Sequence, residues 1–264
     1  MSPLAPAPSR ATAPTTATEA GPVTAGTSAT AAWSADPYTV ALRSGRGPLY
    51  LRRGDGWLLP LDVERWCEAP DPADWTVLRR CRGAVLDIGC GPGRLVSALA
   101  ARGHRALGID VSPEAVARTV RAGGAALHRS VFDSLPAEGR WDTALLIDGN
   151  IGIGGDPTAL LRRMAEVVAV TGSLIVECAE TDPGTVSGTV SGTVSGTDPE
   201  ADLDERCEVR VADGRGGLGA PFAWARVGPA ALARHATATG WAPADGWTAA
   251  GRTFAVLIRP AATP

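Results

Sequence analysis

A short apolar run that ends in a glycine-rich loop constrains this chain more than any other feature. Residues 84–94 read Ala-Val-Leu-Asp-Ile-Gly-Cys-Gly-Pro-Gly-Arg, and the apolar pair Leu95-Val96 follows. This order predicts a strand, a tight loop and then a helix. Glycine at 89, 91 and 93 allows positive φ angles and leaves main-chain amides open to a ligand that a Cβ would hold away. The loop therefore predicts a binding site for a small molecule.

A second predicted strand, Arg105–Asp110, lies at the spacing of a βαβ unit and ends in an acid. Asp110 comes 21 positions after Gly89, close to the ~20 residues at which nucleotide-binding βαβ units place a carboxylate on ribose hydroxyls. Asp87 precedes the first glycine, and a carboxylate there suits a sulfonium and an ammonium better than a pyrophosphate. The nicotinamide fingerprint would also place glycine where this chain has Arg94. The pattern therefore favours S-adenosylmethionine, with Asp110 as the ribose ligand.

These two segments resemble the class I S-adenosylmethionine-dependent methyltransferases. The resemblance is carried by residues 85–94 and by Gly108-Ile-Asp-Val-Ser112, and a weaker similarity extends over roughly 83–180 and 221–259. It implies an α/β fold: a Rossmann-like seven-stranded sheet, mostly parallel with an antiparallel last strand, and helices on both faces. The cofactor-binding residues expected on this basis are Asp87, Gly89, Cys90, Gly91, Gly93, Asp110, Val111, Val131, Phe132 and Asp148.

The resemblance places the adenine beside residues 130–136. Ser130 stands where the family has an acid, and Asp133 comes three residues later. The adenine contact is therefore expected from the backbone at Val131 and from Phe132. An ordinary core position for Phe132 fits the pattern equally well.

The methyl-transfer centre is expected after the strand Thr143–Ile147, which is continuously apolar and predicts burial on both faces of a parallel sheet. Ligands bind beyond the carboxyl ends of such strands, so Asp148 and Asn150 should face this centre. A turn-forming role for Asp148 is the alternative. No Pro-Pro pair follows Asn150, unlike in members of the family that methylate nucleic-acid bases or glutamine, and this favours a small-molecule acceptor.

The chain divides into three predicted parts. Residues 1–36, rich in Ala, Thr, Pro, Ser and Gly, predict a disordered tail. Residues 37–82 predict a cap made of a hairpin over 48–61 and a helix that begins at Pro72 with Asp71 as N-cap. The resemblance implies that this cap helps to form the substrate pocket, and simple packing on the sheet is the alternative.

Residues 83–264 predict the methyltransferase core. A flexible insertion at 182–205, in which Gly-Thr-Val-Ser occurs three times in succession, interrupts it. The other predicted elements are helices over 94–102, 113–121, 158–170 and 228–240, strands over 125–132 and 173–178, and hairpins over 206–227 and 245–258.

Composition restricts the remaining possibilities. The 264 residues, 45% of them hydrophobic, suffice for one core, and a net charge of −3 disfavours a nucleic-acid partner. Five cysteines without a Cys-x-x-Cys pair and three histidines make a disulfide framework or a metal site unexpected. No apolar run of ~20 residues and no secretory signal is visible, so we expect a cytoplasmic protein without a membrane partner. The oligomeric state is not predicted.

The predicted chemistry is an in-line displacement at a carbon that the sulfonium activates, so alignment and exclusion of water matter more than a strong base. For an acceptor that carries a proton, Asp148, Glu177 and His128 are alternative bases, and the sequence assigns no catalytic residue among them. Two rival functions stay open. A nicotinamide-dependent oxidoreductase would use the same βαβ unit and Asp110, and a non-catalytic binding module would keep the fold alone.

Overall fold

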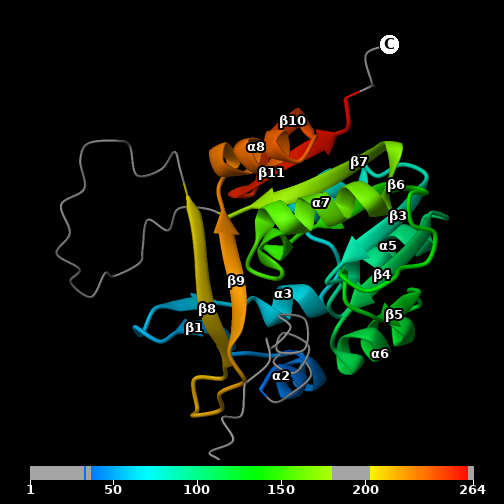
Figure 1. Cartoon of the computed structure of the whole chain (residues 1–264). Helices are drawn as coiled ribbons and strands as arrows, with labels where there is room; N and C mark the ends of the chain where they lie inside the picture. The colour runs from blue at the N-terminus through cyan, green and yellow to red at the C-terminus, as the bar shows by residue number, and fades with distance from the viewer. Residues whose placement is uncertain (1–32, 34–36, 180–202, 261–264) are drawn as a thin grey trace, which may run out of the picture.

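The computed structural model describes residues 33, 37–179 and 203–260, and these form two β-sheets with helices around them (Figure 1). The strands of the larger sheet follow the order β10 (Ala242–Ala249), β11 (Arg252–Ile258), β7 (Val168–Cys178), β6 (Trp141–Leu146), β3 (Ala84–Ile88), β4 (Arg105–Asp110) and β5 (Ala126–His128). Among these, β11 runs antiparallel to β10 and β7, whereas the pairs from β7 to β5 are parallel. The predicted seven-stranded sheet with its antiparallel last strand is therefore confirmed.

Helices cover both faces of this sheet, as the resemblance implied. On one face, α4 (Pro72–Leu78) and α5 (Arg94–Ala101) pack against Val85, and on the other, α7 (Pro157–Val167) and α8 (Pro229–Ala238) pack against Leu86. Neighbouring residues of β3 reach opposite faces because side chains alternate along a strand. Both are completely buried, and burial of one such side chain stabilises the fold by about 1.5–3 kcal/mol. The apolar run of β3 thus forms the centre of two cores.

Helix boundaries follow the capping residues of the sequence. The Asp71 carboxylate accepts a hydrogen bond from Asp74 N at 2.7 Å and completes a capping box at the start of α4. Ser112 caps α6 (Pro113–Arg121), which contacts β4 and β5 and lies next to α5. No helix in the described ranges has the length and apolar character that crossing a membrane requires.

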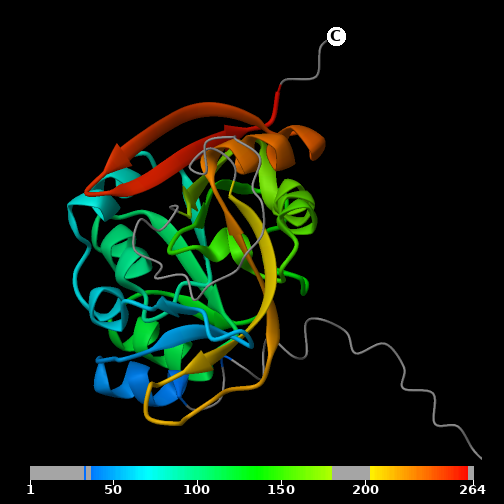
Figure 2. The same ribbon diagram turned by 90° about the vertical axis from the view of Figure 1, so that its left-hand side faces the viewer.

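The smaller sheet has the order β2 (Leu58–Pro60), β1 (Tyr50–Arg53), β8 (Asp204–Ala212) and β9 (Phe222–Val227). Both predicted hairpins are confirmed, β1–β2 and β8–β9. The pairing of β1 with β8, which joins the two hairpins into one sheet and places Leu51 opposite Val211, was not predicted. Figure 2 shows β8 and β9 running from the side of α8 to α2 (Tyr38–Ser44). Residues near the N-terminus and residues after position 200 therefore share one sheet, next to α2 and α3 (Val63–Cys67).

Three predicted boundaries were wrong. The strand expected over 125–132 covers only β5, because Ser130 and Asp133 form a turn in which each main-chain N–H bonds to the other residue. The helix expected to reach residue 170 ends at Val167, and the next residues join β7. Residues 204 and 205, assigned to the insertion, begin β8. The predicted tail, Trp33 apart, and the Gly-Thr-Val-Ser repeats lie outside the described residues.

Candidate functional site

A cavity of about 420 Å³ lies where the strand order of the large sheet reverses. β3 pairs with the next strand in the chain, β4, on one side and with β6 on the other. Such a reversal opens a crevice beyond the carboxyl ends of the strands, which is where open α/β sheets bind ligands. The cavity is bounded by the glycine loop, by the residues after β4, β5 and β6, and by the second sheet.

Two hydrogen bonds hold the glycine loop against β4. The main-chain N–H groups of Gly89 and Cys90 both donate to the carbonyl of Ile109, at 2.9 and 3.0 Å. The φ angles of Gly89, Gly91 and Gly93 are 67°, 54° and 88°. Glycine adopts such positive φ angles more easily than any other residue. Gly89, Cys90 and Gly91 line the cavity, whereas Gly93 does not.

The three glycines face different surroundings. A Cβ at Gly89 would lie 2.7 Å from the amide nitrogen of Asn150, and a Cβ at Gly93 would lie 2.5 Å from Thr119 of α6. At Gly91 the nearest atom would be the hydroxyl oxygen of Tyr38, at 3.9 Å. Glycine is therefore needed for packing at 89 and 93, whereas a Cβ at Gly91 would lie at ordinary van der Waals distance from Tyr38.

Asp110 lines the cavity at the end of β4 and is buried. Its carboxylate accepts hydrogen bonds from the main-chain N–H of Gly91 at 2.9 Å and of Ser112 at 2.8 Å. Burial raises the pKa of Asp110 to about 6, although these two amides favour the charged form. A carboxylate has about four acceptor positions, so hydrogen-bonding capacity is left for a ligand. Val111, the next residue, also lines the cavity.

Asp87 lies at the end of β3, is 3% exposed and does not line the cavity. Burial raises the pKa of its carboxyl to about 8, and Arg94 lowers it only in part. A cation placed near Asp87 would stabilise the charged form and lower this pKa. Asp87 is therefore not placed to touch a ligand in the cavity directly, as its prediction as a binding residue required.

We expect the variant Asp87→Asn to be more stable than the wild type at pH 9. Because the folded-state pKa is raised to about 8, the folded protein holds a proton that the unfolded chain releases above about pH 4, and the wild type loses stability as pH rises between these values. The advantage of the variant should grow by up to about 1.4 kcal/mol per pH unit from pH 5 to pH 8 and then stay constant. Urea unfolding across this range measures it. A difference independent of pH would contradict the raised pKa.

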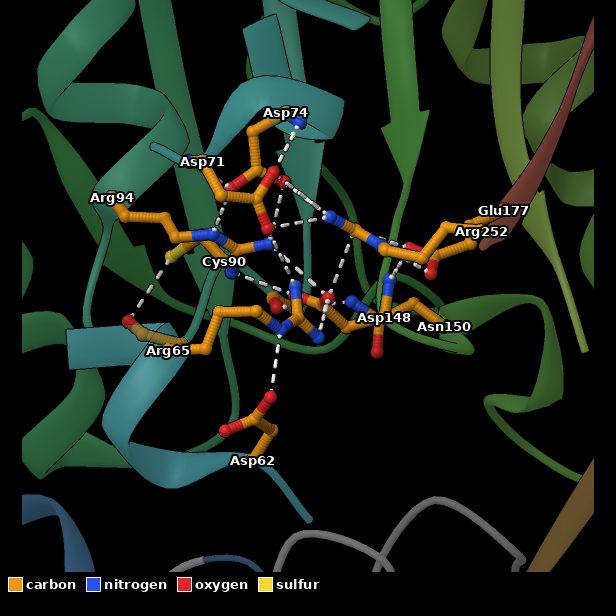
Figure 3. A network of polar contacts seen from close by, with 12 residues as sticks. Asp62, Arg65, Asp71, Asp74, Cys90, Arg94, Asp148, Asn150, Glu177 and Arg252 are labelled. Carbon is orange, nitrogen blue, oxygen red and sulfur yellow. Dashed lines mark hydrogen bonds and ion pairs between the residues drawn. The ribbon is translucent and has the colours of Figure 1, made fainter. Parts of the chain in front are cut away.

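Asp148 lines the cavity but its carboxylate binds three arginines (Figure 3). The distances are 2.7 Å to Arg94, 2.9 Å to Arg65 and 3.3 Å to Arg252. Burial alone would raise the pKa of Asp148, but these guanidinium groups outweigh it and lower the pKa to about 2. A carboxylate so stabilised is a poor proton acceptor near neutral pH. The turn-forming alternative also has support, since Asp148 has a φ of 58°.

The arginine–carboxylate network joins elements far apart in the sequence. Arg94 of α5 and Arg252 of β11 both bind Asp74 of α4, at 2.7 and 2.9 Å, and Arg252 also binds Glu177 of β7 at 2.8 Å. Figure 3 shows the guanidinium groups converging on these carboxylates. The described residues contain no group of three or more His, Cys, Asp or Glu suited to a metal ion. The network fixes α4 and α5 against the strand ends that carry the site.

The other two candidate bases do not line the cavity. Glu177 accepts hydrogen bonds from Arg252 and from the main-chain N–H of Asp148, the latter at 2.7 Å. The His128 ring contacts the carbonyl of Val111 at 2.9 Å. Asn150 does line the cavity, but its amide donates to the carbonyls of Ile88 and Gly89, at 2.7 and 3.0 Å, and so supports the loop.

Val131 and Phe132 both line the cavity after β5. Val131 is buried, whereas Phe132 is 44% exposed, so Phe132 is not the core residue that the alternative assumed. A Cβ on Gly154 would lie 2.9 Å from the Phe132 ring, which places the ring against the loop after β6.

Sequence analysis missed one wall of the cavity, which is aromatic. Five aromatic residues, here called the aromatic wall, line the cavity from α2, α3, β9 and the segment before α2: Trp33, Tyr38, Trp66, Phe222 and Trp224. The wall has no local sequence signature because its members come from separate segments. Burial raises the pKa of Tyr38 well above its usual value, so its phenol stays protonated. Tyr38 and Trp66, from the predicted cap, therefore line this cavity.

The chain is similar to known methyltransferases in part of its sequence and in its fold. A family model described as a methyltransferase domain matches residues 85–172. An S-adenosylmethionine-dependent methyltransferase from Bacteroides fragilis, solved with S-adenosylhomocysteine, is 20% identical with a TM-score of 0.65, over 84% of this chain and 92% of that protein. The CcbJ methyltransferase from Streptomyces caelestis is 18% identical with a TM-score of 0.54, over 75% of this chain and 96% of that protein.

The family model spans β3, the glycine loop, β4 and β6, and the likeness to the solved methyltransferases extends the shared fold to most of the chain. Residues 85–172 therefore match a methyltransferase domain in sequence, and the chain shares its fold with solved S-adenosylmethionine-dependent methyltransferases.

Proposed function

We propose that this enzyme binds S-adenosylmethionine at the glycine loop and transfers its methyl group to a small molecule held in the same cavity. The observation that carries the proposal is that Gly91, which lines the cavity and has no Cβ to narrow it, lies directly beside the buried carboxylate of Asp110. When bound, the cofactor supplies a methyl carbon that its sulfonium has already activated. The residues of the chain have to bind it, align it and exclude water.

The roles of the binding residues follow from their positions. Asp110 would accept hydrogen bonds from the ribose hydroxyls, and the main chain around Cys90 and Gly91 would lie against the nucleoside and the amino-acid portion. Val131 and Phe132 would contact the adenine. These contacts need a cradle without a Cβ and a buried acid, and the described residues supply both.

Two acids lie near the proposed position of the cofactor's positive charge. Asp87 and Asp148 lie at the ends of β3 and β6, on either side of the point where the strand order reverses. Arginines surround Asp148, so its charge is already balanced, whereas Asp87 forms no ion pair with a described residue. Asp87 is therefore the acid we propose for the cationic amino group, acting at short range without lining the cavity.

A small acceptor is favoured because the second sheet closes the far side of the cavity. Leu51 of β1, Leu61 after β2 and the aromatic wall all line it. Cavities of a few hundred cubic ångströms with apolar walls and a few convergent polar groups are typical small-molecule sites. The space left beside a bound nucleoside suits a compact acceptor rather than a polymer.

Calorimetry of the full chain with S-adenosylmethionine, S-adenosylhomocysteine and NADH tests the cofactor assignment. We expect both sulfur nucleosides to bind with micromolar affinity and NADH not to bind, because a pyrophosphate would lie near the buried acids. Tighter binding of NADH than of S-adenosylhomocysteine would overturn the proposal and support the oxidoreductase alternative.

Asp110→Asn should weaken the binding of S-adenosylhomocysteine about 10- to 100-fold, since a charge-assisted hydrogen bond contributes about 1.5–3 kcal/mol. The matched control is Asp142→Asn. The Asp142 carboxylate also accepts a hydrogen bond from a main-chain amide, that of Ala84 at 2.7 Å, but does not line the cavity. Equal affinity in the two variants would remove Asp110 from the binding site.

A further inference from the structure

The hydroxyl group of Tyr38 is a hydrogen-bonding group without a partner at the cavity. Tyr38, the first residue of α2, is 4% exposed and lines the cavity. No described residue forms a hydrogen bond with its hydroxyl oxygen. Trp66 Nε1 is also without a partner but is sealed off, whereas the Tyr38 oxygen keeps accessible surface. Native proteins satisfy the large majority of buried hydroxyl groups, so a ligand in the cavity is the expected partner.

The phenol of Tyr38 stays protonated and can therefore donate a hydrogen bond. Burial raises the pKa of Tyr38 well above its usual value, and the negative charge of Asp110 raises it further. Among the charged groups around the phenol, Asp110 has the largest effect on this pKa. Tyr38 thus presents an O–H group to the cavity at neutral pH, in the field of the Asp110 carboxylate.

Gly91 lies beside both groups. The hydroxyl oxygen of Tyr38 is 3.9 Å from the Cβ position of Gly91, and the main-chain N–H of Gly91 donates to Oδ2 of Asp110 at 2.9 Å. Among the described residues, Tyr38 and Asp110 form no hydrogen bond with each other, and both line the cavity with Gly91. A ligand at this part of the glycine loop therefore meets a phenol donor and a carboxylate acceptor.

Helix α6 holds the two groups in a fixed relation. Ser112 at the start of α6 donates its main-chain N–H to Oδ1 of Asp110 at 2.8 Å. The helix that carries Tyr38 packs on the same α6, where Arg118 donates to the carbonyl of Leu42. The donor and the acceptor are therefore placed by one supporting helix, although they come from distant parts of the sequence.

A hydroxyl group is the chemical group that suits a phenol donor next to a carboxylate. Its hydrogen can bond to the carboxylate while a lone pair on its oxygen accepts from the phenol. A ligand carboxylate would be repelled by Asp110, and an ammonium group has no lone pair that can accept from Tyr38. The oxygens of S-adenosylmethionine belong to its carboxylate, its ribose ring and its two ribose hydroxyls. Of these, only the ribose hydroxyls both donate and accept.

We propose, on the basis of the function proposed above, that Tyr38 binds the cofactor: its hydroxyl donates a hydrogen bond to the ribose hydroxyl that itself donates to Asp110. One ribose hydroxyl is thus held between a residue of the predicted cap and a residue of the core. The cap then takes part in recognising the cofactor as well as in bounding the cavity.

Calorimetry of the full chain with S-adenosylhomocysteine and with its 2′-deoxy and 3′-deoxy analogues tests this assignment. Tyr38→Phe keeps the ring and removes only the hydroxyl. This variant should bind S-adenosylhomocysteine about five- to tenfold more weakly than the wild type does. It should bind the analogue that lacks the shared hydroxyl with wild-type affinity, and it should lose as much affinity for the other analogue as for S-adenosylhomocysteine.

Tyr50→Phe is the matched control, because Tyr50 is the only other tyrosine of the chain and does not line the cavity. It should bind all three nucleosides as the wild type does. Equal binding of S-adenosylhomocysteine by Tyr38→Phe and Tyr50→Phe would overturn the proposal. An equal loss by Tyr38→Phe for all three nucleosides would also overturn it, because the phenol would then contact another part of the cofactor.

Thermal unfolding separates this role from a purely structural one. The Tyr38 hydroxyl has no described partner in the free protein, so Tyr38→Phe should unfold at the wild-type temperature or above it. Only the rise in unfolding temperature caused by S-adenosylhomocysteine should be smaller. A less stable free protein with an undiminished rise would show a structural role and contradict the proposal. If the wild type does not bind S-adenosylhomocysteine, the proposed function fails; if it binds and Tyr38→Phe binds equally well, only the role of Tyr38 fails.

Discussion

Replacing Gly91 with valine is expected to reduce the affinity for S-adenosylhomocysteine at least 100-fold while the protein stays folded. The nearest atom to a Cβ at this position is the hydroxyl oxygen of Tyr38, 3.9 Å away, so the Cβ fits and the two methyl groups beyond it would take up space between residues that line the cavity. The positive φ of 54° adds backbone strain of about 1–2 kcal/mol, which a protein of ordinary stability tolerates. Calorimetry gives the affinity, and thermal unfolding shows that the fold remains.

Gly103→Val separates the effect on the ligand from the effect on the backbone. Gly103 has a φ of 81°, no atom lies within 4 Å of its Cβ position, and it does not line the cavity. This variant should carry a similar cost in stability and bind S-adenosylhomocysteine like the wild type. Loss of binding in both variants would mean that strain rather than occlusion is responsible.

The second large effect concerns the arginine–carboxylate network. Asp148→Asn should lower the free energy of unfolding by about 3 kcal/mol, because it leaves buried guanidinium charge without its counter-charge. The side chains of Arg94 and Asp148 are 5% and 16% exposed, so water compensates little. Asparagine tolerates a positive φ, and the variant therefore tests the charge rather than the turn. Urea unfolding at pH 7 measures the change.

A surface ion pair provides the control. Arg80 and Asp245 are 3.2 Å apart, and their side chains are 36% and 51% exposed, so Asp245→Asn should cost no more than about 1 kcal/mol.

The difference in the free energy of unfolding between the wild type and Asp148→Asn should also depend on pH. Because the pKa of Asp148 is lowered to about 2, its stabilising charge is fully present above about pH 4 and is lost as pH falls toward 2. A difference that persists undiminished at pH 2 would mean that ion pairing is not its origin.

The sequence predicted that Asp148 follows a buried strand, but not that its carboxylate binds three arginines. A carboxylate after a buried parallel strand reaches the ligand edge of the sheet, which the pattern predicts. Its partners are Arg65, Arg94 and Arg252, and of these only Arg94 is close to a recognised motif. The sequence shows which arginines exist but not which of them meet. Glu177 was a candidate base because the sequence does not reveal its ion pair with Arg252. That ion pair depends on the antiparallel pairing of β7 with β11.

The sequence by itself determined the large sheet, the glycine loop and the place of Asp110, because these depend on short-range information. Apolar runs, capping residues and glycines report local backbone preferences within a few positions of each other. The second sheet, the aromatic wall and the arginine–carboxylate network were decided only by tertiary structure. They bring together residues from both ends of the chain, such as Leu51 with Val211 and Asp71 with Arg252, and no local pattern records which distant side chains will share a buried site.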